Sequence, residues 1–147
     1  MGFISQTSLF DVGSPNNRIA NVVCDNSVYE GSFVKMSSLG IAFNALADTI
    51  DNANVIGCVE SKETSTLCTI RFLGLTNGDI FSDLDVTKDY YLSDTVAGGI
   101  TTTPPVGTGK VVLYLGQAFS SSKFLIKRGI GMVRSWLHQQ IYGFVLF

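Results

Sequence analysis

The apolar positions of the chain fall into short stretches, separated by turn-forming residues at a spacing of roughly ten residues. Ser32 to Met36 alternates between polar and apolar positions, as a half-buried strand does. Thr66 to Leu75 carries apolar residues on both faces, which predicts a strand in the middle of a sheet. Asn77-Gly78 is a strong turn signal. No long helical period appears before residue 131, so the pattern predicts an all-β fold, a small β-barrel or a sandwich.

Three short segments carry more specific expectations. Gly57 lies within a strand predicted from Asn54 to Glu60, where a glycine allows another backbone to approach closely. Ile41 to Asp48 is rich in alanine and has room for one helical turn, although it is short for a helix. Pro104-Pro105 has no backbone donors, which places it at a sheet edge or in a loop.

The two ends of the chain differ from the part between them. Residues 1–19 are polar with isolated apolar positions and have too few of these to fold alone. Residues 20–128 hold the strand pattern and form the expected barrel or sandwich body. Residues 129–147 are almost uncharged after Arg134, and such an apolar segment exposed to water is an aggregation hazard. We therefore expect an extended N-terminal arm and an apolar C-terminal interaction tail.

These two ends are the predicted partner interface. For the arm, docking onto a partner and a frayed terminus remain alternatives. The tail has to be covered by its own body or by a partner chain, and we favour the partner because the body looks complete without the tail. The predicted interface consists of the large apolar side chains of both ends: Phe3, Ile4, Leu9, Phe10, Trp136, Leu137, Ile141, Tyr142, Phe144 and Phe147.

Composition limits the possible classes of function. The 147 residues suit one domain. Only 15% are charged, which suits a protein that packs against neighbours and also suits a stable barrel. The net charge is −2 and the longest basic run is Lys127-Arg128, which argues against nucleic-acid binding. We expect no signal peptide, because Met1-Gly2-Phe3 lacks a basic start, and no membrane partner, because the apolar stretches are too short to span a bilayer.

The cysteines and the single histidine predict neither a metal site nor a cofactor. Cys24, Cys58 and Cys68 are odd in number and lack a CxxC spacing, so buried reduced thiols are favoured over a disulfide. His138 lies 70 positions beyond Cys68, too far along the chain to suggest a zinc ligand set.

The sequence also shows no arrangement of residues that is typical of a catalytic site. A nucleophile needs a base that takes its proton, and His138 lies in the apolar tail. Several aspartates crowd between Asp79 and Asp94, which leaves a calcium site or a carboxylate pair open, although solvated loop acids are favoured. We therefore predict that the chain is not an enzyme. A depolymerase fragment that depends on this Asp-rich loop remains the weakest alternative.

Between residues 20 and 127 a series of short motifs follows in a fixed order. Its members are Asp25, Val28, Gly31 and Val34; Ala45-Leu46-Ala47-Asp48; Val55-Ile56-Gly57; Gly74; Tyr90-Tyr91-Leu92-Ser93; Gly98-Gly99-Ile100-Thr101; Pro104-Pro105; and Val111 with Leu115 to Ser120. In this order the series resembles the small β-rich modules of tailed-phage virions, both capsid decoration (cement) proteins and fibre-associated domains. The apolar tail after Arg128 departs from that pattern.

The resemblance implies a structural role in the virion of a bacteriophage, assembled in the host cytoplasm, commonly as a homotrimer. As a decoration protein, the chain is expected to bind the major capsid protein, or another virion protein, and neighbouring copies through its ends. The alternative is a tail-fibre or receptor-binding module that contacts a host surface glycan through Tyr90, Tyr91 and Asp83. Tyrosines that alternate along a strand are, however, more often core and rim residues.

Overall fold

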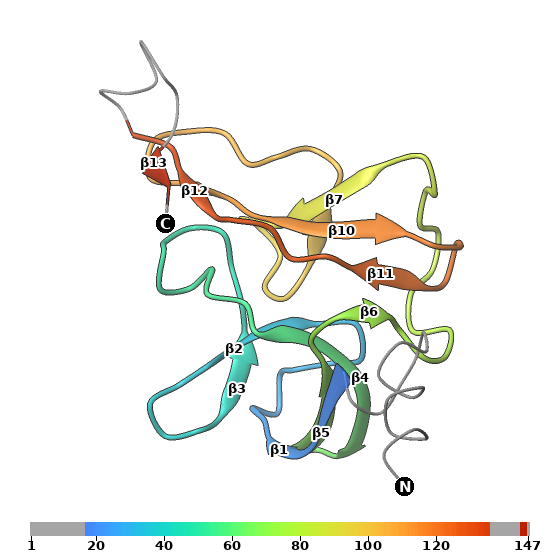
Figure 1. The fold of residues 1–147 in the computed structure, drawn as a ribbon. Coiled ribbons are helices and arrows are strands. Elements are labelled where there is room, and N and C mark those ends of the chain that lie inside the picture. The colour runs from blue at the N-terminus through green and yellow to red at the C-terminus, as the bar shows by residue number, and fades with distance from the viewer. Residues whose placement is uncertain (1–16, 136–144, 147) are drawn as a thin grey trace, which may run out of the picture.

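The computed structural model describes residues 17–135 and 145–146 of the chain, and this part is all-β with no α-helix (Figure 1). The all-β prediction is therefore confirmed. The strands are β1 (Arg18–Val23), β2 (Phe33–Met36), β3 (Ala42–Asn44), β4 (Gly57–Thr64), β5 (Leu67–Arg71), β6 (Gly74–Leu75), β7 (Asp89–Leu92), β8 (Ile100–Thr101), β9 (Val111–Val112), β10 (Tyr114–Ala118), β11 (Phe124–Ile126), β12 (Met132–Val133) and β13 (Val145–Leu146).

These strands form three antiparallel sheets. Sheet A has the order β1-β5-β4-β2-β3 and forms the lower layer of Figure 1. Sheet B has the order β6-β11-β10-β7-β8 and forms the upper layer, next to the smaller sheet C, β13-β12-β9. Strand β5 pairs with both β1 and β4, so the prediction of a central strand within residues 66–75 is confirmed. The end of that range, β6, belongs instead to sheet B.

Sheet A curls until its two edge strands meet, but it does not close. Cys24, directly after β1, forms a single bridge with Ala42 of β3, and the Asp25 N–H donates to the Ala42 carbonyl at 2.9 Å. The register of β1 on β5 shifts between Ile19 and Val22, and Asn21 in that stretch has φ 58°. Because such a bulge bends and twists its strand, the edges touch at one point only. In the described residues the predicted barrel is therefore not a closed one.

The main core lies between sheet A and the other two sheets. Phe124 of β11 is at its centre, with its ring centroid 5.6 Å from Phe33, 5.6 Å from Phe81 and 5.7 Å from Tyr90. A second, smaller core lies within the curl of sheet A, and its members are small or β-branched: Cys24, Val28, Val34, Ala42, Val59, Cys68 and Ile70.

The apolar run from Val111 to Ala118 passes from one sheet to another. Val111 and Val112 pair with β12 in sheet C, and the chain from Tyr114 pairs with β7 and β11 in sheet B. Leu113 between them is fully buried, and its carbonyl accepts from the Leu92 N–H at 3.0 Å. One continuous segment thus holds the two upper sheets together.

Close backbone approach explains the glycine of β4. A Cβ on Gly57 would lie 2.5 Å from the Arg71 carbonyl oxygen, so the expectation for this position is confirmed.

Pro104 and Pro105 lie in the loop between β8 and β9, as predicted. The expected helical turn at 41–48 is wrong: its first part is β3, because Ala42 and Asn44 pair with β2.

The described ends extend the body at both sides. Strand β1 begins at Arg18 and so includes the last two residues of the range assigned to the arm. At the other end, Met132 and Val133 pair with Val112 and Val111 of the body, and with β13. The start of the tail is therefore part of the body's own sheet, whereas residues 136–144 and 147, for which we predicted a covering partner chain, lie outside the described residues.

Candidate functional site

The two neighbouring tyrosines of β7 point to opposite faces of sheet B. Tyr90 is 7% exposed, and its hydroxyl accepts a hydrogen bond from the Asp85 N–H at 2.8 Å. With its ring packed edge-on against Phe124, Tyr90 belongs to the core. The structure thereby removes Tyr90 from the predicted glycan contact, because a buried ring has no free face for a sugar.

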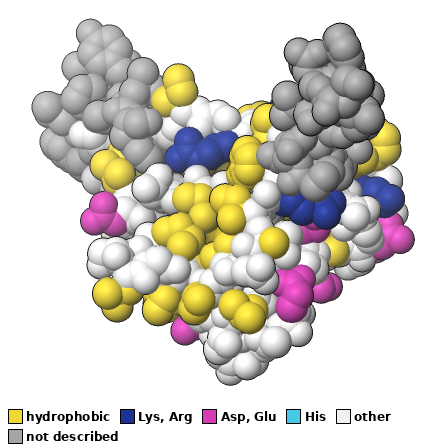
Figure 2. Space-filling view, turned by 60° about the horizontal axis from the view of Figure 1, so that its bottom comes forward, with side chains coloured by type: hydrophobic (Ala, Val, Ile, Leu, Met, Phe, Trp, Pro, Cys, Tyr) yellow, Lys and Arg dark blue, Asp and Glu magenta, His cyan; other side chains and the backbone are white. Residues whose placement is uncertain are grey.

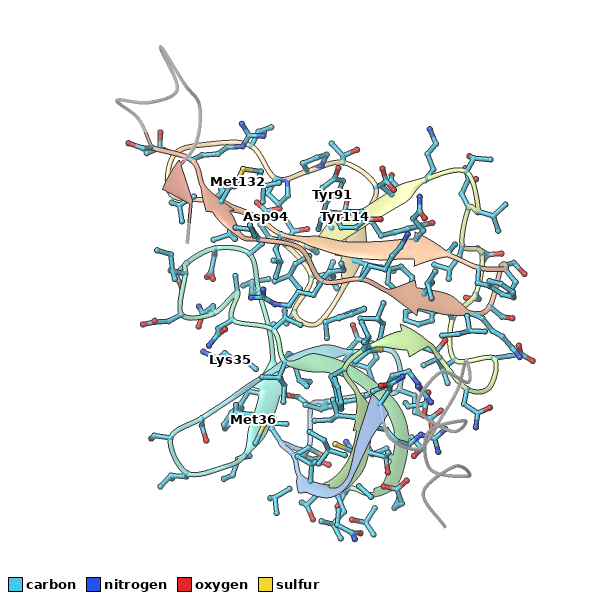
Figure 3. All side chains as sticks on the ribbon, viewed as in Figure 1. Lys35, Met36, Tyr91, Asp94, Tyr114 and Met132 are labelled. Atoms are coloured by element: carbon cyan, nitrogen blue, oxygen red, sulfur yellow. The ribbon has the colours of Figure 1, made fainter. Side chains whose placement is uncertain are left out.

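Tyr91, in contrast, lies on the outer face of sheet B beside Tyr114 (Figure 3). The two ring centroids are 5.9 Å apart and the ring planes meet at 70°, so the rings do not form one flat platform. Burial, followed by the nearby Asp89 carboxylate, raises the pKa of Tyr114 above its usual value. The Gln117 amide also donates to Asp89, at 3.0 Å. Asp83 is exposed in the loop that precedes β7 and has φ 59°.

Four of the aspartates in residues 79–94 have separate local partners: Asp79, Asp85, Asp89 and Asp94. Asp85 accepts hydrogen bonds from the N–H of Thr87 at 3.0 Å and from its hydroxyl at 2.7 Å, which lower the pKa of that carboxyl. Asp94 forms an ion pair with Lys110 at 3.5 Å. Within the described part of the chain, no group of three His, Cys, Asp or Glu side chains is placed to hold a metal ion. Among the described residues the acids of this loop therefore do not form a cluster of three that would suit a calcium ion.

The three cysteines are free and buried, as predicted. Burial raises the pKa of the Cys58 thiol, and it raises the pKa of Cys68 to about 12. Because the thiolate is the nucleophilic form, these thiols are chemically inert in the folded protein at neutral pH.

A buried ion cluster, which the sequence pattern did not reveal, ties sheet A to the loop after β6. Glu60 and Arg71 are 6% and 0% exposed, and the Arg71 Nε donates to the Glu60 Oε2 at 2.5 Å. The Nε of Arg18 lies 3.1 Å from the other carboxylate oxygen. The backbone N–H of Asn77 also donates to Glu60, at 2.6 Å. One carboxylate thus connects β1, β4, β5 and the turn at 77–78.

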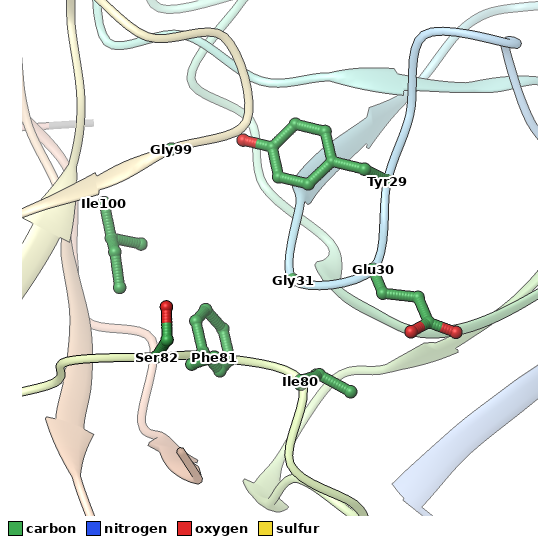
Figure 4. A pocket seen from close by; sticks show the side chains of 8 residues that line it. All are labelled: Tyr29, Glu30, Gly31, Ile80, Phe81, Ser82, Gly99 and Ile100. Carbon is green, nitrogen blue, oxygen red and sulfur yellow. The ribbon is translucent and has the colours of Figure 1, made fainter. Parts of the chain in front are cut away.

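A hollow lies at the seam between the two layers (Figure 4). Its volume is about 260 Å³, and three separate chain segments form its walls: residues 29–31, 80–82 and 99–100. The segments approach closely because Gly31 has φ 93° and no side chain, so that a Cβ there would lie 3.3 Å from the Ile80 carbonyl oxygen. No local sequence signal connects the three segments, and sequence analysis missed this site.

Exposed apolar side chains gather where the N-terminal segment joins the body. The Phe72 N–H donates to the Asn17 carbonyl at 3.0 Å, which holds residue 17 against the end of β5. Around this bond Ile19, Phe72 and Leu73 are 48%, 39% and 50% exposed. We call these three side chains the N-terminal root. Figure 2 looks onto the lower side of Figure 1 and shows several exposed hydrophobic side chains on this face, with acidic and basic groups around them.

The start of the C-terminal segment is held differently. Arg134 N–H donates to the Lys110 carbonyl at 2.9 Å, and the Arg134 Nε donates to the Pro105 carbonyl at 2.7 Å. Nearby in sequence, Ile130 is 68% exposed. The predicted interface residues of both ends lie outside the described residues: Phe3, Ile4, Leu9, Phe10, Trp136, Leu137, Ile141, Tyr142, Phe144 and Phe147.

Comparison with known proteins gives no relative: no family model, no curated protein and no solved structure matches this chain. Among the described residues there is no helix with the length and hydrophobicity needed to cross a membrane.

Proposed function

We propose that this chain is a structural virion protein, a capsid decoration or cement protein. It binds the major capsid protein, or another virion protein, and neighbouring copies through its terminal segments, and it acts as a homotrimer without a cofactor. The observation that supports this most directly is the position of the exposed apolar side chains: Ile19, Phe72 and Leu73 surround the point where residue 17 joins the body. The low charge of the chain and its all-β body agree with such a role.

The energetic argument is one of apolar burial. Covering exposed apolar surface contributes about 25 cal/mol per Å², so about 200–300 Å² at the N-terminal root supplies several kcal/mol toward offsetting the entropic cost of association. The strand pairing of β12 with β9 holds the C-terminal segment on the body, which makes it a fixed point of attachment. Both segments thus begin from ordered strands.

Deletion of the ends tests this proposal. We expect that removing residues 1–16, or residues 136–147 while β12 is kept, weakens binding to the virus particle at least tenfold. The measurement is co-sedimentation with particles of the virus that encodes the chain, after its native copies have been removed. The far-UV circular dichroism should stay that of a folded β protein, because neither deletion enters residues 17–135 and the second removes only the two-residue edge strand β13 from sheet C.

A matched pair of surface variants makes the test local. Ile19→Ser in the N-terminal root should reduce particle binding, whereas Phe119→Ser should not, since Phe119 is 62% exposed in the turn after β10 and is not part of that root. Unchanged co-sedimentation of both deletion variants would contradict the proposal.

A receptor-binding module is the second candidate function. The hollow between residues 29–31, 80–82 and 99–100 favours it, because ligand sites are usually concave and preformed. Of the residues first predicted to touch a glycan, Tyr91 and Asp83 remain exposed or half-exposed, but they do not line this hollow.

A further inference from the structure

The hollow at the seam has the size of a site for one small ring. Its volume of about 260 Å³ lies just below the range of about 300–1,000 Å³ that is typical of pockets for drug-sized ligands. The space therefore suits one monosaccharide unit and is too small for a nucleotide or an extended peptide. An oligosaccharide can still place one of its units there, since the hollow opens to solvent at the exposed Tyr29 and Ser82.

The walls of the hollow are held by hydrogen bonds to the sheets. The Gly31 N–H donates to the Val59 carbonyl at 2.8 Å, and the Phe81 N–H donates to the Ser122 carbonyl at 3.1 Å. The third wall is fixed by the Gly99 carbonyl, which accepts from the Ser93 N–H at 3.0 Å. Such a preformed site loses little conformational entropy when a ligand binds.

The lining combines an aromatic ring with two polar groups. The Tyr29 side chain is 44% exposed, and its hydroxyl donates to the Ala97 carbonyl at 3.2 Å, which fixes the ring across the mouth. Figure 4 shows Ser82 across the hollow from Tyr29, and Glu30 on the side away from Ser82. One oxygen of the Glu30 carboxylate accepts from the Lys62 N–H at 3.4 Å, and the other oxygen is left for a ligand at the rim. The floor is apolar, formed by the side chains of Ile80, Phe81 and Ile100.

This set of groups matches the chemistry of a pyranose. One face of a sugar ring carries C–H groups that pack on an aromatic side chain, and its hydroxyls bond to carboxylate and hydroxyl oxygens. Glu30 is an acceptor only, so it pairs with sugar hydroxyls or with the N–H of an N-acetyl group. No Lys or Arg lines the hollow. A negatively charged sugar or a phosphate would face the Glu30 carboxylate without a compensating cation.

We propose that this hollow binds one neutral or N-acetylated hexose unit of a surface glycan, with the Tyr29 ring as the packing surface and Glu30 and Ser82 as the hydrogen-bonding groups. The inference rests on the second candidate function and names its ligand class and its residues. A single sugar unit offers few atoms, so affinity for a free monosaccharide is on the order of a few millimolar.

The test is a titration of the full-length chain followed by ¹H–¹⁵N NMR. The probes are glucose, galactose, rhamnose and N-acetylglucosamine, with glucuronic acid as the acidic comparison, each up to about 50 mM, well above the expected dissociation constant. We expect at least one neutral sugar to shift the amide signals of residues 29–31, 80–82 and 99–100, and glucuronic acid to bind more weakly. Absence of shifts with every neutral sugar overturns the proposal.

Three variants locate the site. Tyr29→Ala and Glu30→Gln should each weaken binding at least fivefold, whereas Tyr91→Ala, which changes the half-exposed tyrosine on the outer face of sheet B, should leave it unchanged. Tyr29→Phe keeps the ring and loses only the hydrogen bond to the Ala97 carbonyl, so its binding should stay within about threefold of the wild type. Binding by this variant would show that the turn still folds without that hydrogen bond. Loss of binding in Tyr91→Ala but not in Tyr29→Ala overturns the assignment.

Host-cell binding by the same proteins separates this site from the receptor function. If the sugar binds the hollow but the protein does not bind cells, the site is supported and the receptor function fails. If the protein binds cells and no neutral sugar binds the hollow, the receptor function survives and the hollow is not its site.

Discussion

The two halves of the chain fill their interiors with different chemistry. The first half forms sheet A, whose inner core is built of small and β-branched side chains with two thiols, Cys24 and Cys68. The second half forms sheets B and C and contributes large apolar side chains, of which Phe124 has contacts with three rings. Between them, the carboxylate of Glu60 joins strands of sheet A to the turn at 77–78. The upper half thus depends on packing volume, and the lower half depends more on a satisfied polar network.

The largest expected effect is on the packed half. Phe124→Ala should lower the free energy of unfolding by about 3–5 kcal/mol, because it removes the ring at the centre of the main core and leaves a cavity. Denaturant unfolding monitored by far-UV circular dichroism measures this change in the free energy of unfolding. Phe119→Ala is the matched control and should change stability by less than about 0.5 kcal/mol, since Phe119 is 62% exposed. Similar losses for the two variants would mean that Phe124 is not at the centre of a packed core.

A smaller effect is expected at the polar joint. Arg71→Met should lower the free energy of unfolding by about 3 kcal/mol. This is the lower end of the range for breaking a buried ion pair, because Glu60 keeps Arg18 and the Asn77 N–H as partners. The double variant Arg71→Met with Glu60→Leu should recover part of this loss, since both members of the buried pair are gone, although the Asn77 N–H loses its acceptor. A double-mutant cycle in urea measures the coupling. If the stability losses of the single variants Arg71→Met and Glu60→Leu simply add in the double variant, the two side chains do not act as a pair.

The smallest effect is a pH dependence that belongs to the lower half. Burial raises the pKa of Cys68 to about 12, so the folded state keeps a proton that the unfolded chain releases above its ordinary thiol value. The stabilising contribution is complete below a pH of about 9 and is lost as the pH rises toward the folded pKa, with a slope of at most about 1.4 kcal/mol per pH unit. Urea midpoints for the wild type and Cys68→Val between pH 7 and pH 10 measure this. An identical alkaline slope in both proteins would show that Cys68 makes no such contribution.

The same contrast explains what could be predicted from sequence. Alternation and turn signals depend on neighbouring residues, so they located the strands, the central position of β5 and the tight approach at Gly57. The pair Glu60 and Arg71 was missed because it depends on the register between β4 and β5, which no local pattern specifies. The switch of sheets at Leu113 is hidden for a related reason, since it lies within an unbroken apolar run.

The candidate sites were harder to predict than the fold. The pattern Asp89-Tyr90-Tyr91-Leu92 did contain the information that Tyr90 faces inward with Leu92, because alternate residues of a strand share a face. The hollow left no such trace, because its walls come from three segments, 29–31, 80–82 and 99–100, that are separated in sequence and meet only in the folded protein. A concave site built from three loops is a property of the tertiary structure alone.

The passage of one segment through Leu113 has a mechanical consequence. A pull on the chain beyond Arg134 is carried first by the backbone bonds between β12 and β9 and by those of Arg134 with Lys110. From Val112 the force passes along the covalent backbone through Leu113 into β10, which is flanked by β7 and β11. The load is thereby spread over sheet B, and tension at this end of the molecule is shared by several strands before any single one is peeled away.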